Sequence, residues 1–172
     1  MNALSNETKL KIEKTIKNLK ANKMDAYYCD NKEDACNLVK TLIKKGDVIS
    51  SGGSVTLKET GVYDIITSSD YKYLDRAAEG ITPEEVEEVY HKTFSSDVYF
   101  ASSNAITENG ELYNVDGNSN RVAAILYGPK SVILVCGYNK IVKNIDEAID
   151  RVKRIAAPSL SLIHISEPTR RS

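Results

Sequence analysis

A regular alternation of short apolar runs with amphipathic helical patterns constrains the fold of this chain more than any other feature. Residues 25–29 and 47–50 have the apolar centres of short strands. Residues 31–45 and 55–60, which follow them, place their apolar side chains on one helical face. Strand, helix, strand and helix in this order predict an α/β fold with a parallel sheet and right-handed crossovers.

The second half of the chain continues this alternation. Residues 82–94 begin with a threonine cap and a proline at the first helical position, which predicts a helix. Residues 97–103 and 131–137 have strand patterns, and the second of these is apolar throughout, as expected when both faces of a sheet are covered. Residues 144–155 have the pattern of a last helix.

Four small residues at 51–54, Ser-Gly-Gly-Ser, follow the strand at 47–50 and form the first candidate site. Small residues let a ligand approach the backbone, and ligands of open α/β sheets bind beyond the carboxyl ends of the strands. The spacing fits neither a P-loop nor a dinucleotide-binding glycine motif. A tight turn between strand and helix explains the same residues equally well. The candidate ligand-binding residues are Gly52, Gly53, Ser54 and Thr56.

Residues 104–121 combine a hairpin with a polar turn. Two short alternating strands, 105–108 and 111–115, enclose an Asn-Gly pair, which predicts a type I′ turn. The polar residues 116–121 run into a helical pattern, and a helix N-terminus favours anions through its free N–H groups. Ordinary helix capping is the alternative, although a cap needs only one or two such residues. The candidate ligand-binding residues are Asp116, Gly117, Asn118, Asn120 and Arg121.

Composition excludes several classes of function. The 172 residues suit one domain with a real core, and the net charge of −1 gives no electrostatic basis for binding nucleic acid or an acidic membrane. No apolar run approaches the roughly 20 residues of a membrane span, and no signal-peptide pattern is expected. Three cysteines without evident pairing indicate reduced thiols and a cytoplasmic protein. With two histidines, no metal site or histidine-based triad is expected.

Six segments carry a resemblance to a known protein family, and they occur in order along the chain. They are Ser-Gly-Gly-Ser-Val-Thr at 51–56 with Glu59 and Gly61, Ser-Asn-Ala-Ile-Thr-Glu-Asn-Gly at 103–110, Asn-Val-Asp-Gly-Asn-Ser-Asn-Arg-Val-Ala at 114–123, Gly-Pro-Lys at 128–130, Asn-Lys-Ile-Val at 139–142 and Ala-Ala-Pro at 156–158. On these residues the chain resembles the LUD-domain family of lactate-utilisation proteins, in its small stand-alone type. The resemblance covers about residues 4–158.

The resemblance implies a fold and a cellular role. The family's fold is similar to that of CoA transferases, ribose-5-phosphate isomerase and glucosamine-phosphate isomerase, a Rossmann-like α/β sheet, here with a β-hairpin insertion. Its implied role is bacterial oxidation of lactate to pyruvate beside iron–sulfur partner subunits. No cofactor is visible in this chain, so it is not expected to oxidise lactate alone. Whether the chain is itself an enzyme stays open.

The same resemblance directs attention to single residues. Glu108 is the candidate catalytic acid/base or nucleophile, because the fold relatives use acids near this sheet edge. Asn104 joins the ligand-binding set, and Arg121 is the expected clamp for a small carboxylate or phosphate. The alternatives are a non-catalytic sensor, an isomerase- or transferase-type enzyme on a small anionic substrate, and a structural subunit for an iron–sulfur partner. A homodimer also stays open.

The last residues depart from the family. Residues 159–172 resemble translated adapter or vector sequence, whereas small members of the family often continue with a cysteine-containing segment. We therefore expect a LUD domain at 1–158, truncated at its C-terminus, and a non-native or disordered tail at 159–172.

Overall fold

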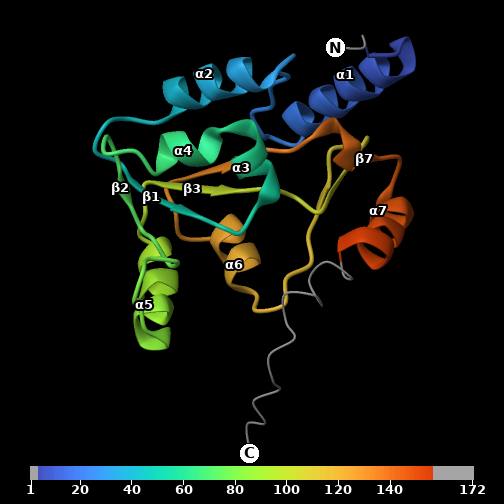
Figure 1. Cartoon of the computed structure of the whole chain (residues 1–172). Coiled ribbons are helices and arrows are strands. Elements are labelled where there is room, and N and C mark those ends of the chain that lie inside the picture. Colours follow the sequence, from blue (N-terminus) through green and yellow to red (C-terminus); the bar gives the residue numbers. More distant parts are fainter. Residues whose placement is uncertain (1–3, 157–172) are drawn as a thin grey trace, which may run out of the picture. The chain divides into compact units, whose positions relative to one another are not determined.

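The computed structural model of the chain describes residues 4–156 (Figure 1). These residues form two compact units, each assembled from separate segments of the chain. The first unit takes its described residues from 4–26, 104–117 and 138–156, and the second consists of 27–103 and 118–137. The domain bounds predicted from the sequence stay a prediction, and the predicted tail lies outside the described residues.

A four-stranded parallel sheet is the centre of the second unit, which confirms the predicted α/β fold (Figure 1). Its strand order is β2-β1-β3-β6, so the two central strands are β1 and β3. The strands are β1 (Val48–Ser51), β2 (Lys72–Tyr73), β3 (Val98–Ala101) and β6 (Ser131–Leu134). The helices are α2 (Lys32–Leu42), α3 (Val55–Thr60), α4 (Val62–Ile66), α5 (Pro83–Thr93) and α6 (Asn120–Leu126).

Helices cover both faces of this sheet, because side chains along β3 alternate between them. Val98 and Phe100 pack into a core formed with α2, α3 and α4. Tyr99 and Ala101 point the other way and pack with Ala124 of α6. Figure 1 shows the same division, with α2, α3 and α4 on one side of the sheet and α5 and α6 on the other.

Local capping signals in the sequence fix the starts of several helices. Thr82 and Glu85 form a reciprocal capping box at the start of α5, as the threonine, proline and acidic residues predict. Ser54 caps α3 by accepting the N–H of Leu57, and α3 ends at Gly61, which has the left-handed conformation that favours glycine. The predicted helices therefore begin where the sequence places their caps.

A small mixed sheet and two helices form the first unit. Its strands are β4 (Ala105–Thr107), β5 (Leu112–Tyr113) and β7 (Ile141–Val142), in the order β5-β4-β7. β4 pairs antiparallel with β5 and parallel with β7. A 3-10 turn (Tyr138–Lys140) precedes β7, and α7 (Ile145–Arg151) is followed by a π-helical turn (Val152–Ala156). The predicted hairpin is confirmed, and its partner strand β7 adds a second sheet to the fold.

Helix α1 (Asn6–Ala21) holds the tip of this hairpin. Asn18 donates its amide to the carbonyl of Glu108 at 2.7 Å, and Asn22 donates to the carbonyl of Gly110 at 2.9 Å. The ammonium of Lys14 lies 2.9 Å from the carboxylate of Glu108. The helix and the hairpin therefore share hydrogen bonds across about 90 residues of sequence.

Two local predictions are wrong. Residues 25–29 form no strand; Tyr27 and Tyr28 are instead 56% and 44% exposed, and the segment pairs with neither sheet. The hairpin turn is not type I′, because Gly110 has φ +84° while Asn109 has no positive φ. The N–H of Gly110 bonds to the carbonyl of Thr107, and the N–H of Thr107 to the carbonyl of Glu111, so the loop has three residues and a glycine bulge.

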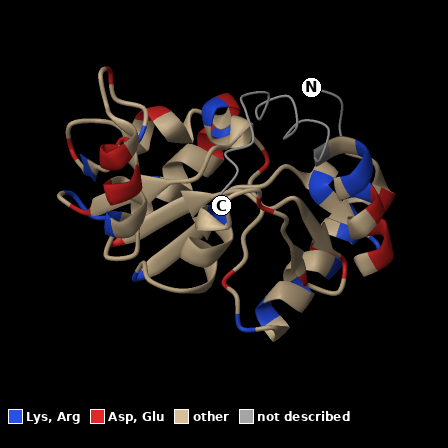
Figure 2. Ribbon diagram, turned by 90° about the horizontal axis from the view of Figure 1, so that it is seen from below, with Lys and Arg blue, Asp and Glu red and all other residues tan. Residues whose placement is uncertain are grey.

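Charged residues of both signs are spread over the described parts of both units (Figure 2). None of the described helices has the length and apolar character needed to cross a membrane.

Candidate functional site

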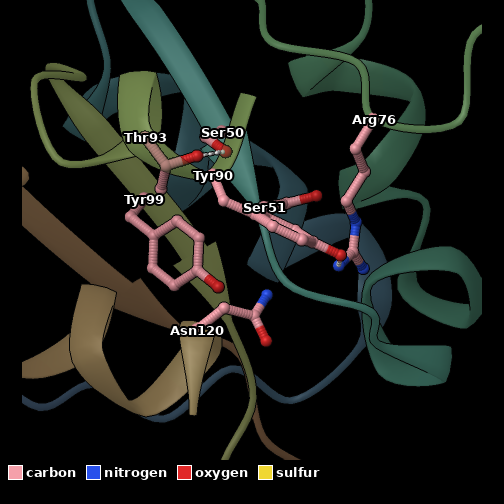
Figure 3. A pocket seen from close by; sticks show the side chains of 7 residues that line it. All are labelled: Ser50, Ser51, Arg76, Tyr90, Thr93, Tyr99 and Asn120. Carbon is pink, nitrogen blue, oxygen red and sulfur yellow. Dashed lines mark hydrogen bonds between the residues drawn. The ribbon is translucent and has the colours of Figure 1, made fainter. Parts of the chain in front are cut away.

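A small polar hollow lies at the carboxyl end of β1 in the second unit (Figure 3). It has a volume of about 10 Å³, roughly the space that one water molecule requires. Parallel sheets bind ligands at this edge, because loops and helix starts gather there. The residues that line the hollow are Ser50, Ser51, Arg76, Tyr90, Thr93, Tyr99 and Asn120. The lining contains hydroxyls, one amide and one guanidinium, and no carboxylate.

Two arginine side chains lie directly against the two glycines that follow β1. A β-carbon on Gly53 would lie 3.0 Å from the Nη2 atom of Arg76. A β-carbon on Gly52 would lie 3.3 Å from the Cγ and Cδ atoms of Arg121. Both glycines therefore let an arginine side chain approach more closely than a β-carbon would normally permit.

Arg76 is the half-buried cation of the hollow. Its Nη1 atom donates to the Tyr90 hydroxyl at 3.4 Å, and its guanidinium carbon lies 5.8 Å from the centre of the Tyr90 ring. Figure 3 shows the guanidinium and this hydroxyl meeting at one side of the hollow. Within residues 4–156, no carboxylate lies within ion-pair distance of Arg76. A guanidinium in this setting attracts an anion, and its planar fork fits carboxylate or phosphate oxygens.

Arg121 and Asn120 come from the turn that the sequence analysis singled out. The Nη1 atom of Arg121 donates to the carbonyl of Ser102 at 2.9 Å, just beyond β3. The side chain of Asn120 lines the hollow, where its amide and the Tyr99 hydroxyl point toward the same space (Figure 3). The structure therefore brings residues from this turn to the Gly52-Gly53 turn.

The backbone of Ser119, directly before Asn120 and Arg121, has an unusual conformation. It has φ +61°, a left-handed conformation that is unfavourable for residues other than glycine and is common at functional sites. Ser119 makes no side-chain cap to α6. The alternative in which this serine is an ordinary N-cap does not hold, whereas Ser54 does cap its helix. Thr56 lies in the first turn of α3, and Asn118 lies in the bend before Ser119.

Two hydroxyl pairs, one buried and one part-buried, hold serines that line the hollow. The hydroxyls of Ser51 and Tyr73 lie 2.7 Å apart, as do those of Ser50 and Thr93. Burial raises the pKa of Tyr73 to about 12, so its phenol stays a hydrogen-bond donor over the whole neutral and mildly alkaline range. Tyr73 can therefore donate to Ser51 and leave the Ser51 proton for a ligand.

The remaining predicted residues lie in the first unit. Asn104 braces the hairpin: its side-chain oxygen accepts the N–H of Val115 at 2.9 Å, and its carbonyl accepts a bond from Arg151. Glu108 is at the hairpin tip, 18% exposed and paired with Lys14. Asp116 and Gly117 follow the hairpin. A catalytic role for Glu108 stays a prediction, and its contacts also suit a structural role.

Sequence reasoning missed most of the lining. Arg76 lies in a segment without a clear sequence pattern, so the sequence gives no reason to select it. Tyr90 and Thr93 are three positions apart on α5, so they share a helical face, which is a detectable signal. Tyr99 lies within an apolar strand and gives no signal of its own. In the described part of the chain, no group of three or more His, Cys, Asp and Glu side chains could hold a metal ion.

Comparison with known proteins identifies the family. A family model described as the LUD domain matches residues 12–170, a range that includes the second unit and most of the first and extends into the predicted tail. No curated protein and no solved structure matches the chain. The match covers most of the 172 residues and agrees with the parallel α/β architecture. The chain therefore belongs to the LUD-domain family, whose domain is associated with lactate-utilisation proteins.

Proposed function

We propose that this LUD domain binds a small organic anion, a carboxylate or a phosphorylated compound, with an anionic oxygen at the hollow beside Gly52 and Gly53. The anion would accept hydrogen bonds from the guanidinium of Arg76 and from the neighbouring hydroxyls and amide. Arg121, whose side chain lies against Gly52, would add a second positive charge. We further propose that the protein acts in the oxidation of lactate to pyruvate as a component that works with an iron–sulfur partner.

One observation carries the binding proposal. Arg76 is half-buried in a lining without carboxylates, and among the described residues no acid forms an ion pair with it. Burying a cation without a counter-charge is costly, so such a site gains stability when an anion binds. The position at the carboxyl end of β1 supports the same reading, since ligands of open α/β sheets bind there.

A thermal-shift screen of the full chain tests this proposal. The compounds are lactate, pyruvate, ribose-5-phosphate, acetyl-CoA and ATP, each titrated to saturation. A ligand at about 100 times its Kd stabilises the native state by about 2.7 kcal/mol, which gives a measurable rise in Tm. At least one compound should raise the Tm of the wild-type protein and fail to do so in Arg76→Gln.

The matched control for this variant is Arg154→Gln. Arg154 is exposed in the first unit, where its only described ion pair is with Asp150 at 3.4 Å. This variant loses the same charge and should respond to the ligand as the wild type does. An equal Tm shift in Arg76→Gln and wild type, or no shift with any compound, would contradict the proposal.

A substitution at Glu108 distinguishes an enzyme from a module that only binds its ligand. The Glu108 carboxylate is already paired with Lys14 at 2.9 Å, which favours the alternative of a non-catalytic ligand-binding module. If Glu108 is the acid/base group of an enzyme, Glu108→Gln should retain ligand binding and abolish turnover of the ligand found in the screen. If the module is non-catalytic, no turnover of that ligand will be found in either protein, and binding will survive the substitution.

A further inference from the structure

A second and larger hollow lies in the first unit, beside α1. Its volume is about 230 Å³. Helix α1 contributes one wall, and the segment from the 3-10 turn into β7 contributes the other. The residues that line it are Thr8, Lys11, Ile12, Tyr138, Asn139 and Ile141. None of them belongs to the anion site proposed above, so this hollow has its own chemistry.

Lys11 gives the hollow a half-buried positive charge. One helical turn further along α1, the ammonium of Lys14 is neutralised by Glu108 at 2.9 Å. Lys11 faces the hollow instead, and in the described ranges no Asp or Glu side chain forms an ion pair with it. A bound carboxylate would therefore do for Lys11 what Glu108 does for Lys14.

The rest of the lining fits a compact apolar body. Ile12 is 6% exposed and forms part of the buried surface, and Ile141 is half-buried beside it. The ring of Tyr138 is 55% exposed and can cover one face of a planar group. The Asn139 side chain, which lines the same hollow as Lys11, offers an amide donor. Apolar walls with a few polar groups are typical of small-molecule sites, and the volume is below the roughly 300 Å³ of drug-sized pockets.

We infer that this hollow is a binding site for a small organic monoanion, a carboxylate that carries a compact apolar or aromatic body. The carboxylate accepts hydrogen bonds from the ammonium of Lys11 and the amide of Asn139. The apolar body packs on Ile12, Ile141 and the Tyr138 ring. Asn139 and Ile141 belong to residues 139–142, one of the six segments that carry the family resemblance. This segment has no part in the proposed anion site.

Amide NMR of the labelled full chain tests the inference, with benzoate as the probe and benzyl alcohol as its neutral counterpart. Benzoate should give saturable shifts at residues 8–12 and 138–141. Lys11→Gln should weaken benzoate binding about tenfold, the effect of losing one charge-assisted hydrogen bond. Benzyl alcohol should bind the wild-type protein weaker by a similar factor.

Two control variants keep the result specific. Lys9 lies on an exposed position of the same helix and outside the hollow, so Lys9→Gln should leave benzoate binding unchanged. Arg154→Gln, at an exposed arginine outside the hollow, should also leave it unchanged. The position of the shifts, at residues 8–12 and 138–141, distinguishes this hollow from the proposed anion site. An unchanged Kd in Lys11→Gln, equal binding of benzyl alcohol, or shifts confined to the residues around Gly52 and Arg76 would each overturn the inference.

Discussion

The hydroxyl of Tyr99 lies 2.8 Å from the position that a β-carbon on Gly52 would occupy. Packing holds the Tyr99 side chain in place, and a backbone hydrogen bond holds Gly52. Tyr99 is only 3% exposed and packs with Ala101 and Ala124, and the N–H of Gly52 bonds to the carbonyl of Phe100 at 2.8 Å. The glycine is therefore required by the packing of a neighbouring strand, apart from any contact with a ligand.

Gly52→Ala should destabilise the protein by about 1–3 kcal/mol, the usual cost of inserting a methyl group into a packed site. The added carbon overlaps the Tyr99 hydroxyl and touches the stem of Arg121. Urea unfolding followed by circular dichroism measures the change in the free energy of unfolding. A variant as stable as the wild type would show that β1 and β3 move apart more easily than their hydrogen bonds indicate.

Gly53→Ala should have the opposite profile, with nearly normal stability and impaired anion binding. Its added carbon would lie 3.0 Å from Nη2 of Arg76, which is the end of a flexible side chain and can move away. Gly53 is exposed, so we expect a stability change within about 0.5 kcal/mol. Displacing the guanidinium should weaken the ligand found by the thermal-shift screen about tenfold. A normal dose response would mean that Arg76 binds from another position.

Gly110→Ala should release the hairpin tip from α1. Gly110 has φ +84°, and an added β-carbon would lie 2.6 Å from the backbone carbon of Asn18, which cannot move aside as a side chain can. We expect a loss of more than about 2 kcal/mol, combining backbone strain with lost hydrogen bonds. Hydrogen exchange of residues 6–21 should become faster.

Gly46→Ala is the matched control for Gly110→Ala. Gly46 has a similar φ of +89°, but no atom lies within 4 Å of its added carbon. It should therefore lose only the strain term of about 1–2 kcal/mol, and exchange in α1 should not change. Equal effects of the two substitutions on α1 would argue against the contact with Asn18.

Asp97 should make stability depend on pH in the acid range. The ammonium of Lys130 at 2.7 Å, and then the N–H of Val48 at 2.8 Å, hold the pKa of Asp97 below its ordinary value of 3.8. A lowered folded-state pKa stabilises the fold above the unfolded-state pKa, and this contribution disappears as pH falls through the folded-state pKa. The stability difference between wild type and Asp97→Asn should therefore shrink below about pH 4.

Carboxyl-carbon NMR measures this pKa directly. Lys130→Met should raise the Asp97 pKa towards its ordinary value, and the bond from Val48 should keep part of the shift. Lys92→Met is the control, because its exposed pair with Glu88 does not touch Asp97. No change of the Asp97 pKa in Lys130→Met would show that the surface pair is absent in solution.

Short-range signals in the sequence predicted the helix starts and the parallel architecture. Thr82 with Glu85, and Ser54 before α3, bond to N–H groups no more than three residues away. Local sequence is therefore enough to predict where these two helices begin. The alternation of strands and helices likewise predicts the parallel order. The family resemblance agrees with the matched family model.

The failures share a physical cause, since each depends on partners far away in sequence. Tyr27 and Tyr28 have high strand propensity, yet a strand forms only where a neighbour supplies hydrogen bonds. The position of Arg76 against Gly53 depends on the fold, because 22 residues of sequence separate the two. The Asn-Gly turn is a three-residue loop whose glycine lies against the backbone of α1. Rules for hairpin turns consider only the residues of the hairpin and cannot predict this contact.

The fastening of the hairpin tip to α1 has a consequence for protein synthesis. Asn22 leaves the ribosome 88 residues before its partner Gly110. At about 5–20 residues per second, the amphipathic helix waits roughly 4–18 s without the segment that it binds. During this interval the side-chain amides of Asn18 and Asn22 lack the hairpin carbonyls that they bond in the fold, so the helix and the hairpin tip can join only after residue 110 has been synthesised.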